Sequence, residues 1–149
     1  MIVHLSRDAE FLNRVVNDPS VFPYVSLGIE GPLDVTPLVE DLSNMFFANE
    51  HGGFLLVHKG ADVYEIHTQF LPTGRGHQVR QAAQEAMEYM FKYTNCEALM
   101  SYVPVENRSA AFLARGVGMQ KCGKVYPLGR ECDLYLIRKG EWLCQSQAQ

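Results

Sequence analysis

The chain has 149 residues, of which 47% are hydrophobic and 20% are charged, and its formal net charge is −4. This length and composition exclude a largely disordered chain and predict one folded domain, which we place at residues 1–144, with a frayed tail over 145–149. The acidic balance and the lack of any Lys/Arg run argue against nucleic-acid binding. No apolar run approaches the roughly 20 residues that a membrane span requires.

Four cysteines, Cys96, Cys122, Cys132 and Cys144, are spread over the C-terminal third of the sequence. They form no C-x-x-C pair and have no histidine at metal-ligand spacing, so the sequence indicates neither a disulfide framework nor a metal site. The first residues lack the apolar core of a signal peptide. We therefore expect reduced thiols and a cytoplasmic protein.

In the first half of the chain, apolar residues at helical spacing predict a helix over residues 6–17 with Ser6 as its N-cap. A short helix is expected over 35–42. The pattern then changes to strands over 45–48, 53–58 and 62–70. The turns between these strands are short, which predicts an antiparallel meander.

In the second half, the spacing of Val79, Ala82, Ala86 and Met90 predicts a long amphipathic helix over 76–93. A strand over 96–103, a helix over 107–115, a strand ending near 125 and a last strand over 132–137 follow. This order predicts an α/β fold, in which a mixed, mostly antiparallel, twisted sheet of about six or seven strands carries helices on both faces and includes one strand–helix–strand crossover.

Residues 71–79, with the sequence Leu-Pro-Thr-Gly-Arg-Gly-His-Gln-Val, join the third of these strands to the long helix. The first N–H groups of a helix have no partner within the helix, and the helix dipole adds positive character there. Glycine lets an anion approach the backbone. The junction therefore predicts a pyrophosphate site.

Other interpretations of this glycine loop are possible from the sequence. A dinucleotide fingerprint would need a third glycine where Val79 stands, and a nucleotide-hydrolase loop would need Gly-Lys-Ser/Thr, which the chain lacks. A turn that only caps the helix remains an alternative.

Two motifs resemble the GCN5-related N-acetyltransferase (GNAT) superfamily, over roughly residues 45–137. The window 73–78 is similar to that family's [Q/R]-x-x-G-x-[G/A], with Gly76 as the central glycine. The second motif, similar to N-x-x-A-x-x-L-Y-x-x-x-G-F, is carried by Asn107, Ala110, Leu113 and Gly118. The run from Leu71 to Gly76 also resembles bacterial and phage-encoded members.

The resemblance implies that the chain binds acetyl-CoA as a cosubstrate. The pantetheine arm would pair with the strand end at Thr68–Phe70, opposite Tyr102 and Val103, and the loop amides would hold the pyrophosphate. The implied cofactor-binding residues are Thr68, Gln69, Phe70, Leu71, Gly74, Arg75, Gly76, His77, Gln78 and Asn107. Arg80 would add charge to the phosphates.

Acetyl transfer to an amine requires a base for the amine proton and an acid for the departing thiolate. Glu65 and His67 share one face of the strand by alternation, and His67 titrates near neutrality in its unperturbed form. In relatives with a base on this strand, the positions align with Asp62 and Tyr64. Glu65, His67 and Tyr64 are therefore the catalytic candidates, while a structural Glu65–His67 pair is the alternative.

The expected function is acetyl transfer to a primary amine of a small molecule or a protein, with no nucleic-acid or membrane partner. The alternative is a catalytically weak or inactive CoA-binding or protein-interaction module. One observation supports this alternative: Ala114 stands where the family commonly has the tyrosine that protonates the thiolate. Tyr102 or Tyr126 could supply that acid instead. Phe22, Tyr24, Phe46 and Phe47 belong either to an acceptor pocket or to the core. Trp142 belongs either to the edge of the sheet or to a homodimer contact.

Overall fold

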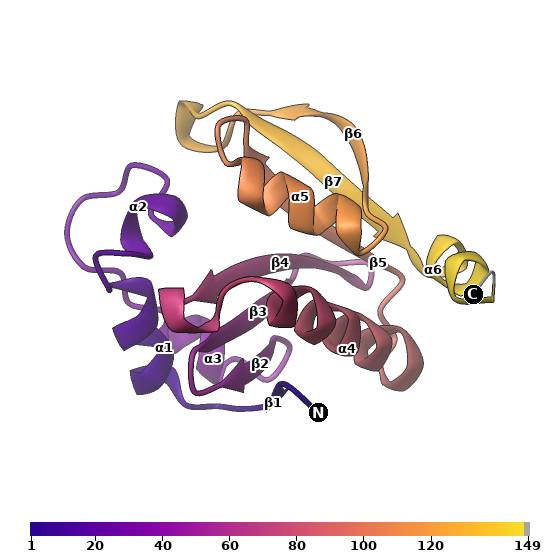
Figure 1. Ribbon diagram of the computed structural model, residues 1–149, viewed down its shortest axis with the longest axis horizontal. Coiled ribbons are helices and arrows are strands. Elements are labelled where there is room, and N and C mark those ends of the chain that lie inside the picture. Colours follow the sequence, from indigo (N-terminus) through magenta and orange to yellow (C-terminus); the bar gives the residue numbers. More distant parts are fainter. Residues whose placement is uncertain (148–149) are drawn as a thin grey trace. The chain divides into compact units, whose positions relative to one another are not determined.

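The computed structural model describes residues 1–147, whose elements follow one another along the chain as labelled in Figure 1. They divide into two compact units, which are described separately: residues 1–57 with 66–86, and residues 58–65 with the chain from 87 onward. Strand β4 (Val63–Phe70) and helix α4 (His77–Tyr93) each contribute to both units.

Seven strands form one open sheet in the order β1-β2-β3-β4-β5-β7-β6. The pairs β1–β2, β2–β3, β5–β7 and β6–β7 are antiparallel, whereas Val63–Glu65 of β4 pairs in parallel with Ala98–Met100 of β5. A parallel neighbour requires a crossover, and α4 supplies it. The predicted mixed, mostly antiparallel sheet with one strand–helix–strand crossover is therefore confirmed.

The first unit contains β1 (His4–Leu5), α1 (Ala9–Val16), α2 (Phe22–Val25), α3 (Thr36–Glu40), β2 (Met45–Asn49) and β3 (Gly52–His58). Helix α1 buries Ala9, Leu12, Val15 and Val16 on one face, as the apolar spacing predicted. Its N-cap is Asp8, whose Oδ1 accepts the Phe11 N–H at 3.0 Å. The predicted cap at Ser6 is wrong, since the Ser6 hydroxyl accepts the Asp8 N–H instead, at 3.1 Å.

The core of the first unit is formed by the apolar face of α1 together with Val21, Val39, Phe46 and Leu55. Phe46 and Phe47 are fully buried, so both belong to the core, the second of the two roles that the sequence left open. Tyr24, in contrast, is 57% exposed on α2. Burial of each large apolar side chain contributes about 1.5–3 kcal/mol, and this drives the docking of α1 and α3.

The second unit contains β5 (Ala98–Pro104), α5 (Arg108–Gly116), β6 (Gln120–Val125), β7 (Cys132–Arg138) and α6 (Lys139–Gln147). Helix α5 packs against β5 (Figure 1). The sequence predicted a frayed tail from residue 145, but 145–147 continue α6, and 148–149 lie outside the described residues. The Trp142 ring lies 5.3 Å from that of Phe91 on α4, so it packs within this unit.

Candidate functional site

The predicted pyrophosphate loop consists of a short 3-10 turn, η1 (Pro72–Gly74), followed by the first turn of α4. Gly76 precedes the helix with a φ of +104°, a conformation that favours glycine, and an added Cβ would meet no protein atom within 4 Å. The backbone is therefore open to an approaching ligand at this residue. Val79 N–H already donates to Gly76 C=O at 3.1 Å.

Three of the five predicted loop amides remain for an anion. Gly74 N–H donates to Leu71 C=O at 2.9 Å and Arg75 N–H to Pro72 C=O at 3.4 Å, so η1 itself uses these two donors. Among the described residues, no acceptor is found for the N–H groups of Gly76, His77 and Gln78. These three exposed residues open a 17-residue helix, where the dipole adds positive character.

His51, in the turn between β2 and β3, holds the first part of the loop, residues 71–74, in place. Its C=O accepts the Leu71 N–H at 2.8 Å, and its Nδ1 lies 2.9 Å from the Thr73 hydroxyl. An added Cβ on Gly74 would stand 2.2 Å from the His51 Cβ, so only glycine fits there. No role for His51 could be predicted from the sequence, because a contact between residues 22 positions apart leaves no local pattern.

Arg75 was expected to reach the phosphates, but its guanidinium already has two protein acceptors. Nε donates to Phe70 C=O at 3.0 Å and Nη2 to Ser20 C=O at 2.8 Å. Both hydrogen-bond acceptors are neutral carbonyls, and the Asp18 carboxylate interacts with the positive charge of the guanidinium. Arg80, one turn into α4, is exposed.

The end of β4 contains the predicted pantetheine residues. Thr68 is exposed, whereas Gln69 and Phe70 are buried. The Gln69 side chain is structural, since its amide nitrogen, once oriented toward acceptors, donates to Gly53 C=O (3.3 Å) and His67 C=O (3.1 Å). Phe70 packs edge-on against Phe54, with ring centroids 5.2 Å apart. Any role of Gln69 and Phe70 toward a cofactor would therefore use their backbone.

The three catalytic candidates lie on the same strand in different surroundings. Glu65 is 8% exposed, and its Oε1 lies 3.5 Å from Lys59 Nζ, a partner that the sequence did not indicate. Tyr64 is half-buried against the His58 ring, and burial, followed by the charges of Cys96 and Asp62, raises its pKa. The phenol is therefore protonated at neutral pH and is a weaker acid than an ordinary tyrosine. His67 is half-buried.

Two residues of the second motif lie at α5. Asn107 is the N-cap, and its Oδ1 accepts the Ala110 N–H at 3.1 Å, which explains an asparagine before this helix. Its amide nitrogen has no partner within residues 1–147. Ala114 is 5% exposed. Of the tyrosines named as substitutes for the acid, Tyr102 is half-buried and Tyr126 is 61% exposed.

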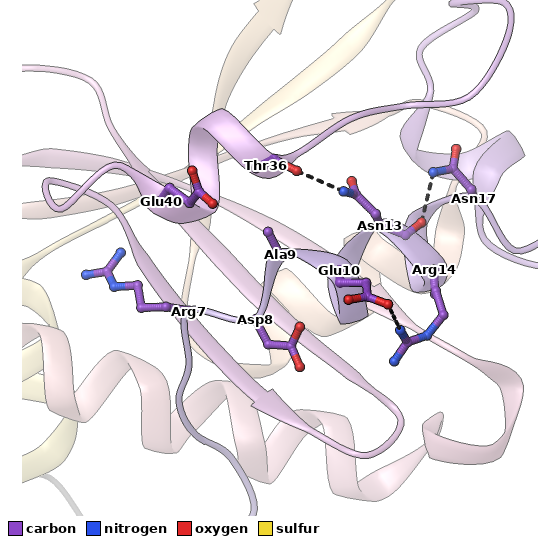
Figure 2. Close-up of a pocket in the computed structure, with 9 residues that line it drawn as sticks. All are labelled: Arg7, Asp8, Ala9, Glu10, Asn13, Arg14, Asn17, Thr36 and Glu40. Atoms are coloured by element: carbon purple, nitrogen blue, oxygen red, sulfur yellow. Dashed lines mark hydrogen bonds and ion pairs between the residues drawn. The ribbon is translucent and has the colours of Figure 1, made fainter.

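An open groove of about 700 Å³ runs along α1 in the first unit (Figure 2). Its side chains bind one another: Asn13 donates to Thr36 at 3.0 Å, and Arg14 pairs with Glu10 at 3.4 Å. Arg7 donates to the backbone carbonyls of Val39, Asp41 and Asn44. The polar groups of this groove therefore hold α1 and α3 together.

Comparison with known proteins identifies the fold. No family model matches the sequence, and no curated protein matches it. The structure is similar to spermidine N-acetyltransferase from Vibrio cholerae in complex with CoA and spermine, with a TM-score of 0.75, 18% identity and coverage of 95% of this chain and 98% of that one. A GNAT-family acetyltransferase from Bacillus anthracis gives a TM-score of 0.71, 19% identity and 90% coverage of each chain.

The chain therefore has the GNAT fold, which confirms the predicted architecture. A single-residue mutant of the Vibrio cholerae enzyme gives a TM-score of 0.74 at 19% identity and covers 97% of this chain and 96% of that one. These neighbours are bacterial, and they give no support to a phage origin. Within residues 1–147, no helix combines the length and apolar character needed to cross a bilayer.

Proposed function

We propose that this protein is an N-acetyltransferase that moves an acetyl group from acetyl-CoA to a primary amine. The proposal is carried by three N–H groups, of Gly76, His77 and Gln78, that have no acceptor within residues 1–147. They lie at the loop where the GNAT resemblance puts the CoA pyrophosphate. A neighbour of the same fold was crystallised with CoA. Arg80 adds charge near the phosphates, and the Thr68–Leu71 backbone pairs with the pantetheine arm.

In the reaction, the neutral amine nitrogen attacks the thioester carbonyl, the C–S bond breaks, and CoA leaves as a thiolate that takes up a proton. We assign the base to His67, because imidazole is the side chain that most often transfers protons in general acid–base catalysis. Tyr64 lies on the opposite face of the strand and stays a separate catalytic candidate, with a phenol that is protonated at neutral pH. Glu65 is ion-paired with Lys59, and its carboxylate contributes to the electrostatic potential around the strand.

The charge distribution along the chain supports one acceptor class over another. Residues 1–44 contain seven of the 17 carboxylate side chains and only two of the 13 basic ones. A region of this charge attracts cations and repels anions. The neighbour crystallised with spermine acts on spermidine. We therefore favour a cationic amine, either a polyamine or a lysine side chain, over a neutral acceptor. The cytoplasmic location and a homodimer stay predictions.

A CoA-binding module without turnover is the second candidate. Ala114 is buried where the family commonly has its acidic tyrosine, and Glu65 is engaged by Lys59. Both observations favour binding over catalysis.

Release of free thiol from acetyl-CoA separates the two functions. We expect release with a panel of polyamines and lysine peptides, and a fall of about 100-fold in kcat for His67→Ala with unchanged acetyl-CoA affinity, as is typical for loss of a general base. Tyr64→Phe tests the candidate on the opposite face: if the phenol takes part in proton transfer, this variant lowers kcat at unchanged KM. Tight acetyl-CoA binding without thiol release from any amine would establish the module instead.

A further inference from the structure

The guanidinium of Arg75 connects the pyrophosphate loop to a segment 55 residues earlier in the chain. It donates from Nε to Phe70 C=O, at the end of β4, and from Nη2 to Ser20 C=O, in the turn between α1 and α2. Arginine suits this bridge because its planar fork presents several donors in a fixed geometry. Both acceptors are main-chain atoms, so the bridge fixes backbone to backbone within the first unit.

The turn at Ser20 is ordered by the carboxylate of Asp18. Asp18 Oδ1 accepts the Ser20 N–H at 2.9 Å and the Ser20 hydroxyl at 2.5 Å, and Asp18 C=O accepts the N–H groups of Val21 and Phe22. The Ser20 hydrogen bonds, with the Arg75 charge, lower the pKa of Asp18. The Ser20 carbonyl is thus presented to Arg75 by a rigid turn.

The segment that follows this turn has few hydrogen bonds to other parts of the chain. Among the described residues, every other hydrogen bond of residues 19–29 stays within residues 18–29, so the Arg75 bond is the one that reaches another part of the chain. Val21 and Ser26 are buried, but Tyr24 and Ile29 are 57% and 49% exposed. An aromatic and an aliphatic side chain are thereby displayed on a segment that Val21 and Val25 pack against the core and that Arg75 hydrogen-bonds to the loop.

We propose that Arg75 is a positioning residue that transmits the order of the pyrophosphate loop to residues 18–29, and that it is not a phosphate ligand. The inference rests on the proposed function, because it assigns to acetyl-CoA the ordering of the loop. Cofactor held at Gly76, His77 and Gln78 fixes the loop directly after Arg75. The bond to Ser20 then holds residues 18–29, with Tyr24 and Ile29, in place for the acceptor.

Hydrogen exchange followed by mass spectrometry tests this coupling without knowledge of the acceptor. In the wild-type protein, saturating acetyl-CoA should slow exchange in peptides covering residues 18–29 as well as in the loop. Arg75→Ala should keep the protection of the loop and lose that of residues 18–29. Arg80→Ala is the matched control, since it removes a neighbouring arginine without the bridge: it should weaken acetyl-CoA binding and, at saturation, leave the protection of 18–29 intact.

If Arg75→Ala proves unstable, Arg75→Lys serves as a second variant, which retains the positive charge. An ammonium cannot span both carbonyls, so this variant should also lose the protection of residues 18–29 while its acetyl-CoA affinity stays within about threefold of wild type. Protection of 18–29 that persists in Arg75→Ala or Arg75→Lys would overturn the inference and leave the proposed function standing. A wild-type protein that binds no acetyl-CoA would contradict the proposed function itself, and this inference with it.

Discussion

Gly76 has two separable properties at the residue scale, a left-handed backbone and open space in front of it. Its φ is +104° and no protein atom lies within 4 Å of an added Cβ; Gly60, in the turn before β4, matches it with a φ of +94° and equally open space. Any L side chain at either glycine costs roughly 1–3 kcal/mol of backbone strain. The two positions differ only in their relation to the proposed pyrophosphate.

Gly76→Glu should therefore weaken acetyl-CoA binding by about 100-fold or more, because a carboxylate would face the phosphates and the charge-assisted hydrogen bonds would be lost. Gly60→Glu should lose similar stability and keep wild-type affinity. Calorimetric titration of both folded variants measures the difference. Equal affinities of the two variants would remove the loop from the binding site.

The cysteines give a second prediction at this scale. Cys96 and Cys132 are buried while Cys122 and Cys144 are exposed, and burial raises the pKa of the Cys96 thiol to about 11. In the native protein at mildly alkaline pH, a thiol reagent should modify two cysteines, and the other two only after unfolding. Rapid modification of all four in native protein would contradict the packing described for β5 and β7.

The raised pKa of Cys96 also gives a pH dependence. The native state holds the thiol proton more tightly than the unfolded state, whose thiol has the ordinary pKa of 9.0. Stability should therefore be insensitive to this group below pH 9 and fall as the pH rises toward about 11. Cys96→Ala, compared with wild type in denaturant titrations across that range, should lose this slope.

At the scale of elements, the loop depends on the turn between β2 and β3. His51 contacts Leu71, Thr73 and Gly74, and the space at Gly74 is closed by the His51 Cβ at 2.2 Å. Gly74→Ala should thus cost about 1–3 kcal/mol in the free energy of unfolding, by overpacking.

A second substitution, His51→Gly, removes the atom that Gly74→Ala would strike. In a double-mutant cycle the two changes should be coupled by about 1 kcal/mol or more in the compensating direction. Denaturant unfolding of the four proteins measures this coupling. Strict additivity of the two changes would show that residues 51 and 74 do not meet.

The sequence predicts regular elements well and the contacts between them poorly. Periodicity located α4, β2, β3, β5 and β7 within a few residues, because their apolar patterns report burial directly. It missed β1, a two-residue strand, and α6, whose apolar residues form no clear face. Nor does periodicity indicate that the Glu85 carboxylate on α4 accepts the Ile2 N–H, at 2.7 Å.

The same limit applies to the candidate site. The glycines and the helix start at residues 76–78 could be located from sequence, because turn chemistry and capping are local. The engagement of Arg75 by Phe70 and Ser20, of Glu65 by Lys59 and of Thr73 by His51 could not. The Ser20 and His51 contacts join residues more than 20 positions apart, and a carbonyl acceptor leaves no trace in residue identity.

For the whole molecule, the central proposal is that a chain with the GNAT fold uses the start of α4 to bind the pyrophosphate of acetyl-CoA. A ligand that binds only the native state stabilises it by about 2.7 kcal/mol at 100 times its Kd, so binding and thermal stability should change together. The fold by itself does not guarantee this, because one fold supports many functions.

Calorimetric titration of the purified protein with acetyl-CoA tests that claim most directly, with CoA and NADH titrated in parallel. The account predicts micromolar binding of acetyl-CoA and of CoA, which share the pyrophosphate and the pantetheine arm, and no comparable binding of NADH, which lacks that arm. Folded protein that binds neither acetyl-CoA nor CoA would contradict the account, and the three N–H groups at the start of α4 would then only begin a helix.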